Sequence, residues 1–263
     1  MYFHFSYRQN TYMVQNVNML KFNYDSASYY RGQQWYQTLC EDCHAKDLGG
    51  KILFQGNGYG RIVAPNITRG DGGASVKYSQ EDWLRIMRHG VKLNNKPAFF
   101  MPTYNLGQLG DEDMRDLNFY MYECPSINKT QPSMIIGWRT RILAGIGWYD
   151  HVFDAEINPQ KQRVEIATPD TTKPMERGAY LTQVCACTNC HGHDLKGKYK
   201  PNRWFRHGPD ITSDGYTGKH NGETFLRFFR SHRQPTTHTR YSHLSMSDLT
   251  ILYKYLHSLP NDH

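Results

Sequence analysis

Four of the six cysteines in this chain occur in two copies of one pattern, CEDCH at 40–44 and CTNCH at 187–191. In each copy the two thiols are three positions apart, so on one helical turn they can add to the two vinyl groups of a single porphyrin. The histidine that follows would bind the iron as its proximal ligand. We therefore expect two covalently attached haem c groups. Their protein ligands would be Cys40, Cys43 and His44 in the first copy, and Cys187, Cys190 and His191 in the second.

Two other kinds of site use a Cys-x-x-Cys pair, namely zinc ribbons and thioredoxin-like redox centres. A zinc ribbon would usually bring its two pairs closer together, and it would not need a histidine after both. Redox motifs lie between a strand and a helix, and no strand-rich pattern surrounds either copy. Composition alone would give only about 0.007 copies of the pentapeptide in a chain of this length. The haem interpretation is therefore favoured.

Each motif begins an internal repeat, which indicates two homologous domains. The second copy is shorter, and seven of its missing residues are lost between the last two matching blocks. The matching blocks are HAKDLGGK at 44–51 with HGHDLKGK at 191–198, APNIT at 64–68 with GPDIT at 208–212, EDWLRIMR at 81–88 with ETFLRFFR at 223–230, and LGDEDMRDLNFYM at 109–121 with LSMSDLTILYKYL at 244–256.

The repeat blocks have the apolar spacing of helices, and little of the chain reads as strand, so the predicted class is all-α. Ser79 with Asp82 resembles a capping box, and Asn221 can cap the matching helix of the second copy. Four segments are expected: an N-terminal extension at 1–28, a first domain at 29–124, a partly helical linker at 125–174 and a second domain at 175–263.

The order of these blocks resembles class I cytochrome c, and specifically the tandem di-haem proteins of bacterial respiratory chains. The resemblance rests on RGQQWYQTLCEDCH, APNITRGDGG, MPTYNLGQLGDEDMRDLNFYM and RGAYLTQVCACTNCHGHDLKGK, and it covers about residues 29–124 and 175–260. It implies two class I cytochrome c domains in tandem. It also implies transfer of single electrons by iron that cycles between the ferrous and ferric states, with no substrate chemistry required.

The same resemblance implies further site residues. Met101 in FFMPTY lies in the loop before the last helix of the first domain, where the family supplies the distal thioether ligand. Pro65 and Pro209 stand where the family places a backbone carbonyl that accepts the other N–H of the proximal histidine. Apart from the resemblance, Met101 could be ordinary core and either proline a turn former.

The second domain has no methionine at the matching position, because the repeat places Thr236 there. Among the neighbouring candidates, His238 is only two positions away on a shortened loop, so we predict that His191 and His238 both bind the second iron. The alternatives are His232, His243, Met246 or a five-coordinate iron. Two nitrogen ligands would give this haem the lower potential.

Charge and hydropathy limit the classes of partner that the chain can bind. The formal net charge is +7, but the basic residues form no continuous run, which disfavours nucleic-acid binding and favours acidic protein surfaces. No segment has 18 consecutive apolar residues, so no transmembrane helix is expected. MIIGWRTRILAGIGW at 134–148 reads as an interdomain helix or packed strap, or alternatively as a docking surface for a membrane or larger complex.

Haem attachment implies an oxidising, periplasmic or otherwise extracytoplasmic compartment. Because the first residues lack an export signal, we expect that the first residue given is not the true translation start. Cys124 and Cys185 are either free and buried or form a disulfide.

The predicted function is a di-haem electron carrier. It would be soluble or a subunit of a larger complex, and its redox partners would be an oxidase, a dehydrogenase or another cytochrome. The alternative is a di-haem enzyme, such as a peroxidase or a sulfur-compound oxidising enzyme, which would need an open or labile distal site on the second haem.

Overall fold

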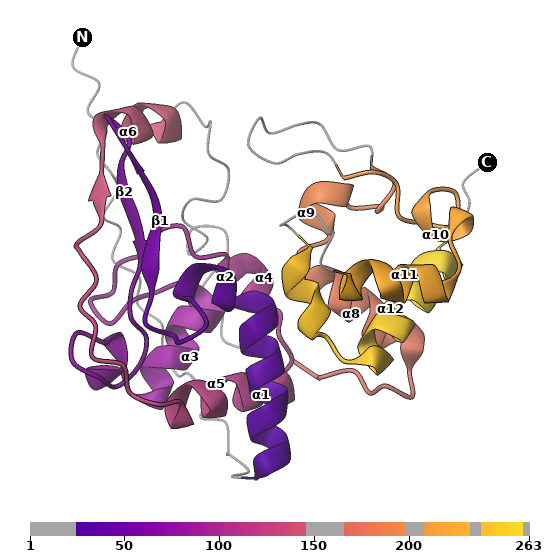
Figure 1. Cartoon of the computed structure of the whole chain (residues 1–263), viewed down its shortest axis with the longest axis horizontal. Helices are drawn as coiled ribbons and strands as arrows, with labels where there is room; N and C mark the ends of the chain where they lie inside the picture. Colours follow the sequence, from indigo (N-terminus) through magenta and orange to yellow (C-terminus); the bar gives the residue numbers. More distant parts are fainter. Residues whose placement is uncertain (1–24, 146–165, 198–207, 232–237, 260–263) are drawn as a thin grey trace.

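The computed structural model describes residues 25–145, 166–197, 208–231 and 238–259 (Figure 1). Most of the expected N-terminal extension, together with Thr236 and His232, falls outside these ranges. The helices and strands of the first half are α1 (Ser26–Leu39), α2 (Glu41–His44), β1 (Lys51–Gly56), β2 (Gly60–Ala64), η1 (Ala74–Val76), α3 (Gln80–His89), α4 (Thr103–Leu106), α5 (Asp111–Glu123), β3 (Ile135–Ile136) and α6 (Trp138–Gly145). Those of the second half are α8 (Pro174–Val184), α9 (Thr188–His191), α10 (Tyr216–Lys219), α11 (Gly222–Arg230), η2 (Thr239–His243) and α12 (Met246–Ser258).

In each half the first long helix crosses the last one at a glycine. A Cβ on Gly32 of α1 would collide with the backbone of Asp116 in α5, and a Cβ on Gly178 of α8 would collide with the side chain of Tyr255 in α12. Only glycine allows two helix backbones to approach this closely. The two halves therefore share the same helix crossing, and in each half the haem-attachment motif follows the first of the two crossing helices.

The middle helices α3 and α11 are held by equivalent contacts in the two halves. Ser79 forms a reciprocal capping box with Asp82 at the start of α3, as predicted, and Asn221 accepts a hydrogen bond from the backbone N–H of Thr224 at 3.0 Å. At the other end of each helix an arginine holds the chain entering the last helix. Arg88 donates to the carbonyls of Gly107 (2.8 Å) and Leu109, and Arg230 donates to those of Ser242 and Leu244 (2.8 Å).

The expectation of an all-α chain did not include an antiparallel sheet in the first half. Strands β1 and β2 form a hairpin, and β3 pairs with β2 so that the strand order is β1-β2-β3. The turn NGYG at 57–60 permits the hairpin, because Gly58 (φ +77°) and Gly60 (φ +95°) adopt a left-handed backbone that other residues avoid. This short sheet supplements an architecture that is otherwise helical in the described residues.

The segment after α5 packs back across the first half. The amide of Asn66, which is fully buried, donates to the carbonyls of Ile127 (2.7 Å) and Lys129 (3.0 Å). The backbone N–H of Ile127 in turn donates to the hydroxyl of Thr68 at 3.0 Å. The linker thus begins as a strap over 125–145 that hydrogen bonds and β3 join to the first half, although most of its side chains are exposed. Residues 146–165 lie outside the described part. Within the described ranges, no helix combines the length and apolar character that crossing a bilayer requires.

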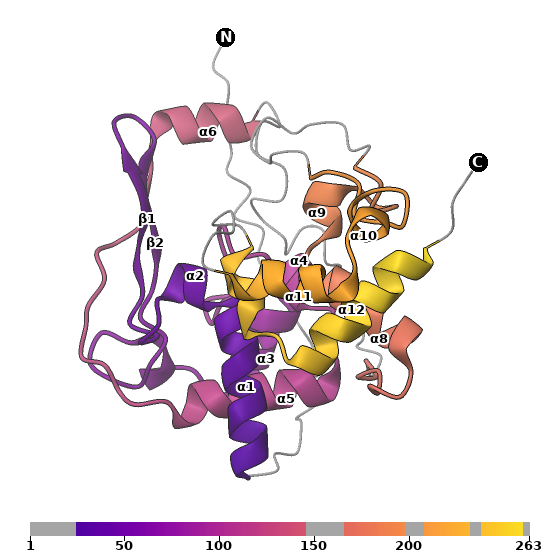
Figure 2. The same cartoon turned by 45° about the vertical axis from the view of Figure 1, so that its right-hand side comes forward.

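The two halves lie side by side and share one apolar cluster (Figures 1 and 2). The Trp35 ring of α1 meets the Tyr180 ring of α8 edge-on at 6.4 Å. Beside them Arg177 of α8 bonds Asp113 of α5 at 3.1 Å and Asp248 of α12 at 2.9 Å, and all three residues are buried. One arginine thereby ties both C-terminal helices together across the interface.

Candidate haem sites

The first motif lies on the turn that joins α1 to α2. The backbone N–H of His44 donates to the carbonyl of Cys40 at 2.8 Å, so the two cysteines and the histidine share one helical turn. The Nδ1 atom of His44 lies 3.0 Å from the carbonyl oxygen of Pro65. Because a carbonyl can only accept, Nδ1 carries the proton and the lone pair of Nε2 remains for a metal. Burial lowers the pKa of His44, which favours the neutral ring that ligation needs.

A strained loop after the motif brings Pro65 to this histidine. Leu48 has a left-handed backbone (φ +61°), and its carbonyl accepts the N–H of Ile67 at 2.9 Å. Gly50 (φ +71°) passes so close to Ala64 and Pro65 that a Cβ would collide with their backbone. The DLGGK sequence therefore holds the APNIT loop over the ring of His44.

The second motif repeats this arrangement. The Nδ1 atom of His191 lies 2.6 Å from the carbonyl oxygen of Pro209, and burial lowers the pKa of its ring. Leu195 (φ +60°) and Gly197 (φ +73°) take the roles of Leu48 and Gly50, since the carbonyl of Leu195 accepts the N–H of Ile211 at 3.0 Å.

Two features distinguish the second site from the first. The chain carries one extra residue before the motif, accommodated by Ala186 in a left-handed conformation (φ +58°), so that α8 ends at Val184. In addition, Gly208 runs directly against the ring of His191, and any Cβ there would collide with Nδ1. Sequence comparison of APNIT with GPDIT shows the alanine-to-glycine change but not its cause.

The thiols of both motifs are free and partly buried. Burial raises the pKa of Cys40 and of Cys187 to about 12. Within the described ranges, no group of three or more His, Cys, Asp and Glu side chains converges to hold a metal ion. Two thiols and one neutral imidazole on a single turn are the donor set that covalent haem attachment requires, and the residues present fit that group.

Met101, which the sequence predicts as the distal ligand of the first site, lies partly buried against the apolar cluster in the loop between α3 and α4. Its carbonyl accepts the N–H of Thr103 at 2.8 Å, which starts α4 directly after Pro102. Met87 and Met114, by contrast, are buried core residues at 1% and 0% exposure. Met101 is thus a methionine placed on a loop rather than inside a helix–helix contact.

The ring centre of His238, the predicted distal ligand of the second site, lies 6.2 Å from that of His191. Two imidazoles that bind one metal ion from opposite sides have ring centres about 6.3 Å apart, given metal–nitrogen bonds of about 2.0–2.1 Å and ~1.1 Å from each nitrogen to its ring centre. The aromatic rings of Phe228, Phe229 and Tyr241 surround His238 at 5.6–6.2 Å. Met246 is 51% exposed in the first turn of α12.

The distal loop of the first half contacts the motif of the second. Asn105 of α4 donates to the carbonyl of Gln183 at 2.8 Å and accepts a hydrogen bond from Asn189 of the second motif at 3.1 Å. In the other direction, η2 follows His238 and packs against α1 of the first half. In each half, the short helix that follows the predicted distal ligand therefore contacts the opposite half near its haem-attachment motif.

Arg240 of η2 lies near a cysteine of each motif. Burial raises the pKa of Cys43 in the first motif and of Cys187 in the second, and the nearby guanidinium of Arg240 opposes both shifts. Arg240 also donates to the hydroxyl of Tyr241 at 2.9 Å, and that hydroxyl donates to the carbonyl of Cys185 at 2.5 Å. No sequence motif marks Arg240, because its role depends on contacts between the two halves.

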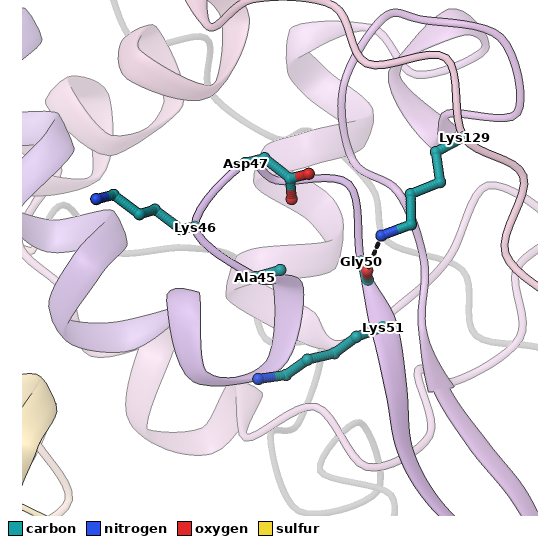
Figure 3. Close-up of a pocket in the computed structure, with 6 residues that line it drawn as sticks. All are labelled: Ala45, Lys46, Asp47, Gly50, Lys51 and Lys129. Atoms are coloured by element: carbon teal, nitrogen blue, oxygen red, sulfur yellow. Dashed lines mark hydrogen bonds between the residues drawn. The ribbon is translucent and has the colours of Figure 1, made fainter.

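A pocket of about 590 Å³ opens beside the first motif, directly after His44 (Figure 3). Lys129 of the strap reaches across it and donates to the carbonyl of Gly50 at 3.0 Å, whereas Lys46 points away. The lysines that line this pocket therefore make the surface next to the first motif positively charged. Its lining residues are Ala45, Lys46, Asp47, Gly50, Lys51 and Lys129.

The two remaining cysteines are both free and buried, which is one of the two alternatives that the sequence left open. Cys124 follows α5 and its thiol contacts the carbonyl of Met121 at 3.1 Å. Cys185 directly follows α8, and burial raises the pKa of its thiol well above the ordinary value.

Comparison with known proteins is consistent with the geometry of the first half. Residues 29–124 match the family model described as Cytochrome c. No curated protein matches the chain. The match spans the first attachment motif, the Pro65 loop and Met101, so this part of the chain is a cytochrome c domain, with the covalently attached haem c and electron-transfer role that such a domain implies.

Proposed function

We propose that the chain is a di-haem c-type cytochrome that carries single electrons between redox partners, with one haem c attached to each half. The observation that carries the proposal is the shared setting of the two motif histidines. Each donates from Nδ1 to a proline carbonyl, at Pro65 and at Pro209, and so presents Nε2 to a metal. The second half thus has the proximal arrangement of the half that matches the cytochrome c family.

The two irons would have different distal ligands. We assign Met101 to the first, because it lies on the loop before α4 in the matched domain. We assign His238 to the second, because its spacing of 6.2 Å from His191 suits two imidazoles on one metal. When bound, each haem c supplies a one-electron couple, and a thioether ligand raises its reduction potential relative to a second histidine. The chain would therefore hold a higher-potential site and a lower-potential site.

The packing of the halves supports transfer within one chain. Asn105 and Asn189 join the distal loop of the first site to the motif of the second, and Arg240 lies near both motifs. These contacts hold the two attachment sites against each other in a fixed orientation. Such contacts would keep two attached haems close to each other, as transfer within one chain requires.

We further propose that the protein works outside the cytoplasm, where c-type haem is attached, with acidic redox proteins as partners. The lysines around the pocket next to His44 would steer such partners toward the first site. The alternative of a di-haem enzyme needs an open distal position on the second iron. The spacing of 6.2 Å between the rings of His238 and His191 gives that alternative less support.

The intact mass of the mature protein and the spectra of two histidine variants test this proposal. The polypeptide should carry the mass of two haems, and a single added haem would overturn the assignment of the second half. His238→Ala should make the second haem high-spin and open to carbon monoxide while the first stays low-spin. His243→Ala, a nearby control in η2, should leave both haems low-spin. A second haem that stays low-spin in His238→Ala would place its distal ligand elsewhere.

A further inference from the structure

An arm extends from the first half, formed by the β1–β2 hairpin, β3 and α6 (Figures 1 and 2). Strand β1 starts at Lys51, next to the first motif, and six residues at about 3.3 Å each carry it ~20 Å to the hairpin turn. The tip of the arm is therefore distant from His44 and from the lysine-lined pocket. Its surface is not used by the proposed electron-transfer function.

The hairpin turn and the first turn of α6 form one cluster at this tip. The backbone N–H of Arg139 donates to the carbonyl of Gly58 at 2.9 Å, and a Cβ on Gly58 would come within 3.1 Å of the indole nitrogen of Trp138. The ring of Phe54 meets that of Tyr59 edge-on at 5.9 Å, and the guanidinium of Arg139 lies over Tyr59 at 5.5 Å.

Helix α6 turns its apolar side away from the protein. Thr140 faces inward, where it is 6% exposed and donates to the carbonyl of Tyr59 at 2.7 Å. Trp138 and Ile142, one turn apart on the opposite side, are 60% and 45% exposed. A surface helix normally buries its apolar stripe against the core, so this orientation points to a binding surface.

More exposed apolar side chains lie on the same arm. Phe54 and Ile52 are 48% and 44% exposed on β1, and Ile135 is 53% exposed on β3. In the paired strands Ile135 lies opposite Arg61 and Phe54 lies opposite Ile62, so Ile135 and Phe54 project from opposite faces of the sheet. Phe54, Trp138 and Ile142 at the tip therefore form an exposed apolar patch of the kind that marks an interaction site.

The charge around this patch has a single sign. The sequence has no aspartate or glutamate from residue 48 to 70 or from 124 to 149, and the arm carries Lys51, Arg61, Arg139 and Arg141. Arg139 and Arg141 flank the Trp138–Ile142 stripe on α6 and are exposed. A second copy of the chain would present the same positive charge and be repelled, and a redox partner would need to approach the distant motifs instead. An anionic lipid surface fits both the charge and the tryptophan-containing apolar stripe.

We propose that the tip of the arm docks on an anionic lipid bilayer, with Phe54, Trp138 and Ile142 inserted at the level of the headgroups and Arg139 and Arg141 paired with lipid phosphates. Both arginines have an apolar stem that can lie along the inserted surface while the guanidinium stays among the phosphates. Docking through the arm would keep the two attachment sites on one side of the membrane. This inference does not depend on the number or ligation of the haems.

Vesicle flotation of the mature holoprotein tests the proposal. Wild type should float with vesicles of phosphatidylcholine containing 30% phosphatidylglycerol at low salt, and not with phosphatidylcholine alone. Arg139→Gln with Arg141→Gln should weaken binding about 25-fold, because each cation near an anionic bilayer contributes about fivefold. The matched control loses the same charge at two exposed lysines of the second half, Lys219→Gln with Lys254→Gln, and should weaken binding far less.

The apolar contribution needs its own pair of variants. Trp138→Ser with Ile142→Ser should reduce binding tenfold or more, whereas Val76→Ser, which changes a residue 60% exposed elsewhere on the first half, should not. Quenching by brominated lipid should remove a fluorescence component that is missing in Trp138→Phe. Equal binding of arm and control variants would overturn the proposal, and so would equal binding to neutral and anionic vesicles. Flotation with neither vesicle, together with binding of an acidic protein at the arm, would assign the arm to a protein partner.

Discussion

Replacing Arg177 by methionine would leave two carboxylates buried together across the interface between the halves. Arg177, Asp113 and Asp248 are 7%, 5% and 8% exposed, and the guanidinium bonds both carboxylates at 2.9–3.2 Å. Removing one partner of a buried ion pair costs about 3–5 kcal/mol, since the remaining charge loses its compensation. For a chain of this size that corresponds to a fall of about 6–20 °C in the apparent Tm.

The loss of stability caused by Arg177→Met should change with pH in a direction that the structure predicts. Burial raises the pKa of Asp113 above its ordinary value, and Arg177 opposes that rise, so the variant carboxyl should have a still higher pKa. A carboxyl whose folded pKa exceeds the unfolded value of about 3.9 stabilises the fold below that value and loses this contribution as the pH rises through the folded pKa. The variant should therefore be closest to wild type near pH 4 and furthest from it at pH 7.

Thermal unfolding followed by far-ultraviolet circular dichroism at pH 4.5 and pH 7 measures both effects. Arg227→Met removes an exposed arginine of α11 and should shift the Tm by no more than a degree or two. Adding Asp113→Asn and Asp248→Asn to Arg177→Met should recover part of the loss at pH 7. A variant that unfolds with wild-type Tm, or with a deficit that does not change between the two pH values, would refute the reasoning.

Three further predictions concern the haem sites. Gly208→Ala should displace the ring of His191 and perturb the absorption spectrum of the second haem while leaving the first unchanged, and an unaltered second haem would contradict the close approach. Met101→Ala should abolish the sulfur-to-iron charge-transfer band of the first haem, and survival of that band would place the thioether elsewhere. Arg240→Gln should lower the potential of the second haem in spectroelectrochemical titration by tens of millivolts, where 59 mV is a tenfold change in the ferrous-to-ferric ratio. An unchanged potential would show that this cation lies too far from the iron to matter.

Local features of the fold could be predicted from the sequence because their causes are local. The Ser79 capping box and the Asn221 cap depend on residues within three positions of each other, and the structure confirms both. The offset between the repeats identified the matching blocks, and the shared positive-φ residues Leu48 and Leu195 now give those blocks a physical basis.

Features that depend on distant segments could not be predicted in this way. The hairpin was missed because KILFQG reads as a short apolar run, and only its pairing with β2 and with the strap makes it a strand. Arg177 and Arg240 have their roles only because the halves pack together, and a single sequence does not show that packing. The distance between His191 and His238 likewise depends on how a shortened loop closes.

The strap after α5 has a practical consequence for dissecting the molecule. A fragment that ends at Cys124 would contain every residue of the first cytochrome c domain by sequence, but it would lack Ile127 and Lys129, the acceptors for the buried amide of Asn66. It would also strip β3 from β2 and turn a central strand into an unprotected sheet edge, which invites aggregation. A fragment that keeps these polar groups satisfied and the sheet covered must therefore extend at least through α6, well beyond the residues that match the cytochrome c family.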